Sequence, residues 1–108
     1  MKSLKSLRFA VLGVATLLAA PAFAKTPIAT ATYRCEGDKG IDATYYPDSV
    51  DLTLTDGRSL ELPQVISGSG TRYANADESF QCWSKGDTAF VTEGSDESMT
   101  FKDCLAIQ

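Results

Sequence analysis

The stretch Val50-Asp-Leu-Thr-Leu-Thr-Asp-Gly-Arg-Ser-Leu-Glu-Leu62 decides the fold of this chain. Apolar and polar residues alternate through its first half, which places Val50, Leu52 and Leu54 on one face of a half-buried strand. The pair Asp56-Gly57 then provides a tight turn of the kind that joins two antiparallel strands. The chain returns through residues 59–62, so the stretch predicts a β-hairpin.

Similar short segments continue on both sides of this hairpin, separated by turns rich in Gly, Asp and Asn. We expect strands near residues 30–34, 41–46, 79–85, 88–92 and 98–103, with an eighth starting near Tyr73. Pro63 predicts a strand end or a sheet edge, because proline has no N–H to donate to a neighbouring strand. Seven or eight short antiparallel strands and no useful helical period are typical of an all-β sandwich or closed barrel.

Residues 1–24 have the composition of an export signal. A cationic start, an apolar run and the small-residue sequence Ala22-Phe-Ala24 predict cleavage before Lys25. The apolar run is too short to span a bilayer comfortably, and no cysteine stands at the cleavage site for lipid attachment. We therefore expect one domain, residues 25–108, that is soluble, periplasmic or secreted, and without a membrane anchor.

The expected domain is acidic. The full chain has 10 Lys and Arg against 14 Asp and Glu, and the leader carries three of the positive charges, which leaves 7 against 14 and a net charge of −7 over 84 residues. Such a charge disfavours nucleic acid and anionic lipid as partners and favours a basic protein. Solubility alone would also account for it.

The chain contains no histidine. This absence removes the commonest general base, the usual partner of a nucleophilic Ser or Cys, and the commonest metal ligand. A hydrolase would have to use paired carboxylates among Asp42, Asp48, Asp51 and Asp56, and nothing in the sequence separates their pKa values. We therefore expect a protein that is not an enzyme and has no metal or cofactor.

Two motifs follow the hairpin. Ser67-Gly-Ser-Gly-Thr-Arg-Tyr73 combines glycines that allow close backbone approach with the hydroxyl of Ser69, which can donate and accept hydrogen bonds. Cys82-Trp-Ser-Lys-Gly-Asp87 ends a predicted strand, with Trp83 and Lys85 on one face and Lys85 at a loop rim. Each motif alone also fits a purely structural interpretation. The first motif can be an ordinary flexible turn, and in the second motif Lys85 can be a solvated side chain and Trp83 a packed aromatic ring.

Together the two motifs resemble the Ser-Gly-x-x-Tyr and Trp-x-Lys-Gly signatures of the MliC/PliC family of bacterial inhibitors of c-type lysozyme. The resemblance covers most of the expected mature chain and implies a small antiparallel β-barrel of about eight short strands. The chain departs from the family pattern at Cys82, where the family often has Phe. The connection from Tyr73 to Trp83 is also slightly longer than usual.

The resemblance implies a mechanism of inhibition. C-type lysozymes cleave glycans with two carboxyl groups, one of which is ionised. The loop with Ser69 and Gly70 would enter that cleft, where Ser69 would hydrogen-bond the carboxyl groups and Lys85 would meet the ionised one. Tyr73 would hold the base of the loop. The implied partner is a c-type lysozyme. Two alternative functions remain open, a structural barrel and a ligand-binding barrel. The cavity of the ligand-binding barrel would be lined by four aromatic residues, Tyr45, Tyr46, Trp83 and Phe90.

Three cysteines allow three pairings, each with one thiol left over. A bridge between Cys35 and Cys104 would join the first strand to the last and stabilise the fold by roughly 4 kcal/mol through constraint of the unfolded chain. The family resemblance implies this same pair. Cys82 would then be a small buried apolar side chain or, alternatively, would form an intermolecular disulfide that makes a homodimer.

Overall fold

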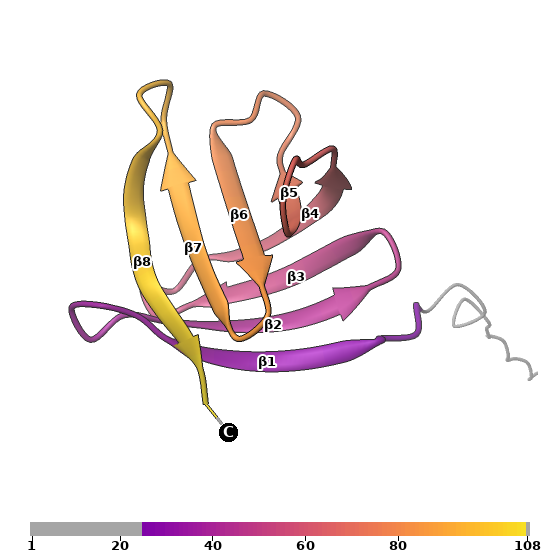
Figure 1. The fold of residues 1–108 in the computed structure, drawn as a ribbon, viewed down its shortest axis with the longest axis horizontal. Coiled ribbons are helices and arrows are strands. Elements are labelled where there is room, and N and C mark those ends of the chain that lie inside the picture. Colours follow the sequence, from indigo (N-terminus) through magenta and orange to yellow (C-terminus); the bar gives the residue numbers. More distant parts are fainter. Residues whose placement is uncertain (1–24, 108) are drawn as a thin grey trace, which may run out of the picture.

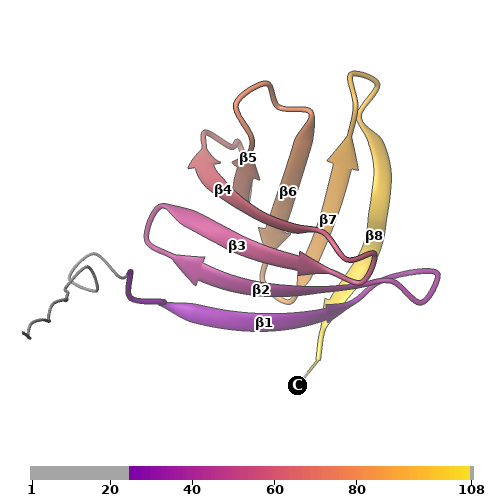
Figure 2. The same cartoon turned by 180° about the vertical axis from the view of Figure 1, so that it is seen from behind.

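The computed structural model describes residues 25–107, and the expected signal peptide at residues 1–24 lies outside them. The described chain forms eight strands: β1 (Ala29–Arg34), β2 (Gly40–Tyr46), β3 (Ser49–Leu54), β4 (Ser59–Val65), β5 (Thr71–Ala74), β6 (Phe80–Lys85), β7 (Thr88–Glu93) and β8 (Ser98–Ala106). Each strand pairs antiparallel with the next, and β8 pairs with β1 to close the sheet (Figures 1 and 2). The predicted all-β barrel is confirmed.

The strands β3 and β4 form the predicted hairpin with the predicted facing, and their register pairs Leu52 with Leu60 and Thr53 with Ser59. Val50, Leu52 and Leu54 are at most 3% exposed and point into the barrel. Gly57 adopts a positive φ of 98°, a conformation that a residue without a Cβ adopts without strain. Its N–H donates to the carbonyl oxygen of Leu54 at 2.9 Å and closes the turn. The alternation of the sequence was therefore sufficient to place this hairpin.

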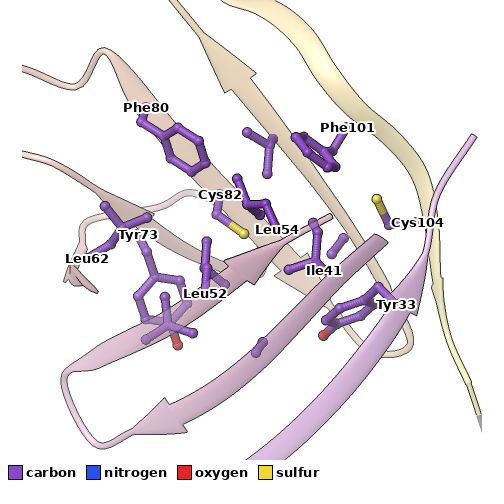
Figure 3. Packing of buried hydrophobic residues seen from close by; sticks show 14 residues of the cluster. Tyr33, Ile41, Leu52, Leu54, Leu62, Tyr73, Phe80, Cys82, Phe101 and Cys104 are labelled. Atoms are coloured by element: carbon purple, nitrogen blue, oxygen red, sulfur yellow. The ribbon is translucent and has the colours of Figure 1, made fainter. Parts of the chain in front are cut away.

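Side chains from all eight strands fill the barrel (Figure 3). Large contributors are Ile41, Leu52, Leu62, Phe80 and Phe101, each at most 4% exposed. Burial of this apolar surface is the main favourable term in folding, at about 25 cal/mol per Å² removed from water. Because a barrel of eight strands has an interior just wide enough for its own side chains, the core leaves the outer wall and the loops as places for recognition.

Two junctions of the barrel are short. β1 and β8 share two paired positions, Tyr33 with Ala106 and Arg34 with Leu105. The Cys35–Cys104 disulfide reinforces this junction and confirms the predicted pair. The other short junction, between β4 and β5, also has two paired positions and no covalent link.

Pro63 lies within β4 and not at its end, which corrects the predicted strand boundary. The next residue, Gln64, donates its N–H to Asp48 on the β3 side at 2.8 Å. Since successive residues of a strand direct their N–H groups to opposite sides, Pro63 has its missing N–H on the side of β5, whose pairing starts only at Gln64. Pro63 therefore lies where β4 is locally unpaired on the side of β5, and not at a strand end or at the edge of an open sheet.

β8 is longer than predicted and continues through Cys104 to Ala106. The register between β7 and β8 shifts twice, and Asp103 has a positive φ of 55°. Such bulges place extra residues in one strand and interrupt the apolar–polar alternation. This is why the sequence pattern failed beyond residue 103.

Candidate functional site

Residues 66–70 join β4 to β5, and we call this connection the Gly/Ser loop. The loop rests on the end of β6. Gly70 has a positive φ of 67°, and a Cβ at this position would lie 2.7 Å from the carbonyl oxygen of Ser84 and 3.2 Å from the Cβ of Lys85. A Cβ that close to backbone is not tolerated, so the absence of a side chain lets the loop approach β6. The two motifs of the sequence therefore form one surface.

Ser69 and Lys85 meet on this surface. The Lys85 ammonium donates a hydrogen bond to the Ser69 hydroxyl at 3.0 Å, and both residues are exposed. Ser67 orders the loop from within, because its hydroxyl donates to the Ser69 carbonyl at 2.7 Å and accepts from the Ser69 N–H at 3.3 Å. The loop thus presents a hydroxyl and a cation side by side.

Tyr73 forms the base of the loop and is only 4% exposed. Its ring packs against Tyr45 with 5.9 Å between ring centroids, and the hydroxyls of Tyr45 and Tyr33 are 2.8 Å apart. Burial raises the pKa of all three phenols further above physiological pH, at which an ordinary tyrosine is already neutral. This aromatic cluster supports the loop from the barrel interior, while Ser69, Gly70 and Lys85 remain exposed.

Trp83 and Phe90 lie on the outer wall next to the loop. Their rings stack with centroids 4.9 Å apart and planes inclined by 13°, and the guanidinium of Arg72 lies 5.7 Å from the Trp83 ring centroid. A surface pocket of about 400 Å³ opens between this stack and the loop, lined by Ser69 and Lys85 among others. The aromatic wall and the polar tip therefore form one continuous site.

Sequence reasoning missed Phe90 and Arg72 as parts of this site. The tight turn at Gly86 pairs Lys85 with Thr88 and so pairs Trp83 with Phe90. That register could have been inferred from the turn, which was predicted. Arg72 pairs with Trp83 across β5 and β6, and nothing in the sequence pattern indicated this pairing.

The aromatic residues of the ligand-barrel rival do not surround a common cavity. Trp83 and Phe90 line the outer pocket, and the ammonium of Lys25 lies 4.5 Å from the centroid of the Tyr46 ring. Tyr45 packs on Tyr73 toward the core. These positions remove the arrangement on which that rival depends.

Cys82 is a buried free thiol, 3% exposed, within the core cluster. Burial raises the pKa of its thiol to about 12. A disulfide from Cys82 to another chain would first require the barrel to open and expose this thiol. The interpretation of Cys82 as a small apolar side chain fits its position.

The acidic residues of residues 25–107 do not gather into a metal site: no group of three or more His, Cys, Asp or Glu side chains among them is placed to hold an ion. Asp56 instead pairs with Arg58 at 2.8 Å, which lowers the pKa of its carboxyl group. Over the same residues, no helix has the length and apolar character needed to cross a membrane.

The fold and the site define a small β-barrel with an exposed Ser–Lys tip beside an aromatic wall. Residues 33–100 match the family model described as MliC, membrane-bound lysozyme-inhibitor of c-type lysozyme. The chain therefore belongs to the MliC family, as the two motifs indicated. The matched region includes the loop, Lys85 and Cys35, while Cys104 lies beyond it.

A curated relative supports the same assignment. The membrane-bound lysozyme inhibitor of C-type lysozyme from Yersinia enterocolitica serotype O:8 / biotype 1B is 42% identical over 76 residues. That alignment covers 69% of this chain and 61% of the relative, so the chain spans less than two thirds of the relative's length. No solved structure matches the chain at a significant level.

Proposed function

We propose that this protein inhibits c-type lysozyme by placing the Ser69–Lys85 tip in the enzyme's active-site cleft. The observation that carries the proposal is the contact of 3.0 Å between the Lys85 ammonium and the Ser69 hydroxyl. Two groups from separate motifs are held together at an exposed tip, and their chemistry matches two carboxyl groups. Membership of the MliC family supports the same target.

The tip has unused capacity for hydrogen bonding. An ammonium group has three donors, and Lys85 takes part in none of the ion pairs formed within the described residues. One donor is used by the Ser69 hydroxyl, and the other donors remain available for the ionised carboxylate of the cleft, while the Ser69 hydroxyl can itself donate to either carboxyl group. Charge-assisted hydrogen bonds in a partly desolvated cleft are stronger than exposed ion pairs.

Inhibition of this kind is occlusion and requires no covalent step. The small side chains of the loop let it enter a narrow cleft, and the internal bonds of Ser67 reduce the entropy lost when the loop binds. The stacked rings of Trp83 and Phe90 lie beside the tip and line the same pocket. The net charge of −7 for residues 25–108 would attract a basic enzyme.

The proposed site of action lies outside the cytoplasm. The leader-like sequence of residues 1–24 predicts release of a soluble periplasmic or secreted form, whereas the name of the Yersinia relative describes a membrane-bound protein. Fractionation of cells that express the full chain, followed by mass spectrometry of the N-terminus, tests this point. A soluble periplasmic product beginning at Lys25 is expected, and a membrane-associated product would contradict it.

The function is tested by a lysis assay in which purified residues 25–108 are titrated against c-type, g-type and i-type lysozymes. Inhibition confined to the c-type enzyme is expected. Lys85→Ala should weaken inhibition by at least about tenfold, as expected for a central charged contact, with thermal stability nearly unchanged. Lys102→Ala removes the same charge at an exposed ion pair with Glu36 and serves as the control.

Two results would overturn this proposal. One is the absence of inhibition of any c-type lysozyme by the wild-type protein. The other, which would remove Lys85 from the mechanism, is an equal potency of the Lys85→Ala and Lys102→Ala variants.

A further inference from the structure

The outer wall of β7 and β8 carries a second apolar surface. Met99 is 53% exposed and Leu105 is 58% exposed. Beside them lies the half-buried ring of Phe90, whose other neighbour is the ring of Trp83. Together with Asp103 these side chains line a second surface pocket of about 400 Å³. We call Phe90, Met99 and Leu105 the β7–β8 wall.

The β7–β8 wall is continuous with the Ser69–Lys85 tip. Thr88, Ala89 and Phe90 line both the pocket beside the tip and the pocket beside Leu105. The strand register also places Lys85 opposite Thr88, and Thr88 opposite Leu105. Two strand spacings of about 4.8 Å separate the backbones of Lys85 and Leu105, which is roughly 10 Å, so one partner can cover both.

Acidic groups border this wall. Asp103 is exposed at the bulge of β8, where its positive φ of 55° turns the backbone. Asp87 lies at the β6–β7 turn, and its carbonyl oxygen accepts the N–H of Ala106 at 2.8 Å, directly beside Leu105. An apolar patch with an acidic border complements a basic protein surface that has an apolar centre.

The size of the tip also argues for additional contact. A stable protein–protein interface buries about 800 Å² on each partner, and the Ser69–Lys85 tip consists of one small residue and one lysine. Apolar side chains in a row beside it would supply the remaining area. The same side chains would exclude water from the charged contact, which strengthens that contact.

We propose that the β7–β8 wall is a second contact surface for the same basic partner, a c-type lysozyme, engaged outside the cleft. The inference rests on the proposed function and extends it, because it assigns recognition of the partner's outer surface to Phe90, Met99 and Leu105. The tip blocks the cleft, and the wall holds the partner in place and selects among lysozymes by the surface beside their clefts.

The test is calorimetric titration of a c-type lysozyme into the wild-type protein and into a Met99→Ala/Leu105→Ala double variant. Loss of two exposed apolar contacts should weaken binding by at least about tenfold. Ile28→Ala is the matched control, because Ile28 is 66% exposed and precedes β1 in another part of the barrel. The control should bind within about twofold of wild type, the ordinary range for a residue outside an interface.

A second variant tests the acidic border with a substitution that should not disturb folding. Asn accepts positive φ readily, so Asp103→Asn preserves the bulge and removes one charge. It should slow association and reduce the salt dependence of the association rate, as rim charges do. An unchanged association rate and salt dependence would remove Asp103 from the contact.

The outcomes separate the two proposals. If the wild-type protein does not bind a c-type lysozyme, the proposed function itself fails. If the wild-type protein binds and the double variant binds equally well, the β7–β8 wall is not a contact and this inference is overturned. The inference is also overturned if sedimentation shows that the free protein is a dimer and that the double variant is a monomer, because the wall would then join two copies of this chain.

Discussion

Gly70 lies against the backbone of Ser84 at a distance that admits no side chain, with 2.7 Å between the position of a Cβ and the carbonyl oxygen. This contact brings the Gly/Ser loop onto β6 and so brings Ser69 to Lys85. The geometry of the tip therefore depends on a glycine that need not touch the partner itself.

Substitution of this glycine should separate the two halves of the site. Gly70→Ala combines a positive φ with a clash against backbone, and we expect a loss of stability of about 1–3 kcal/mol and at least a tenfold loss of inhibition. Gly68→Ala is the control, because a Cβ there meets nothing within 4 Å. Urea unfolding and the lysis assay measure the two effects, and equal behaviour of both variants would contradict the role of Gly70.

The Cys35–Cys104 disulfide should make a large contribution to stability. It closes a segment of 69 residues, and constraint of the unfolded chain over that length corresponds to roughly 4 kcal/mol. Urea unfolding with and without reductant should show a loss of this size. A Cys35→Ala/Cys104→Ala variant should be as unstable as the reduced protein and insensitive to reductant, and a reductant effect in that variant would point elsewhere.

Acid should weaken a cluster centred on Arg58. The Arg58 guanidinium donates to both carboxylate oxygens of Glu93, at 2.8 Å and 2.9 Å, and lies 5.5 Å from the centroid of the Phe80 ring. The hydrogen bonds from Arg58 lower the pKa of Glu93 below its ordinary value of 4.5. A lowered folded-state pKa stabilises the protein above the unfolded value and ceases to do so as pH falls through the folded value.

We therefore expect Arg58→Met to lower the free energy of unfolding at pH 7 by about 1 kcal/mol, since both partners are partly exposed. The variant should also lose part of the decline in stability that the wild type shows below about pH 4.5. Thermal melts between pH 2 and pH 7 measure both effects. Parallel stability profiles for the two proteins would exclude the ion pair as the source of the acid dependence.

The buried thiol of Cys82 should be inert in the native state. Because the pKa of the thiol is raised to about 12 by burial and the thiolate is the reactive form, a thiol reagent at pH 8 should label it only after unfolding. Cys82→Ala should retain full inhibition of lysozyme. Rapid labelling of the folded protein, or a disulfide-linked dimer on a non-reducing gel, would contradict this expectation.

Much of the fold could be predicted from local patterns. Alternation placed Val50, Leu52 and Leu54 in the core, and regular turns implied a closed antiparallel sheet. The prediction failed where backbone irregularity matters, at the bulge of Asp103 and at Pro63 within β4. Periodicity carries no information about such bulges, since it assumes one residue on each strand at every step.

The site was less accessible to sequence reasoning. The contact between Ser69 and Lys85 spans 16 residues and crosses from one strand connection to the end of another strand, so no local spacing indicates it. Family resemblance selected these two residues, whereas the stack of Trp83 on Phe90 could have been inferred from the tight turn between their strands. The clash that makes Gly70 necessary depends on three-dimensional distances alone.

The two short junctions of the barrel differ in one respect, because the β1–β8 junction has a covalent bond and the β4–β5 junction does not. Local opening should therefore be easiest where β4 meets β5, and the amide hydrogens of residues 71–74 should exchange with solvent sooner than those of β3. This is the junction that carries the Gly/Ser loop. We therefore expect covalent closure at the β1–β8 junction to leave opening motions mainly to the β4–β5 junction, where the loop would have to adjust to lysozymes of different shape.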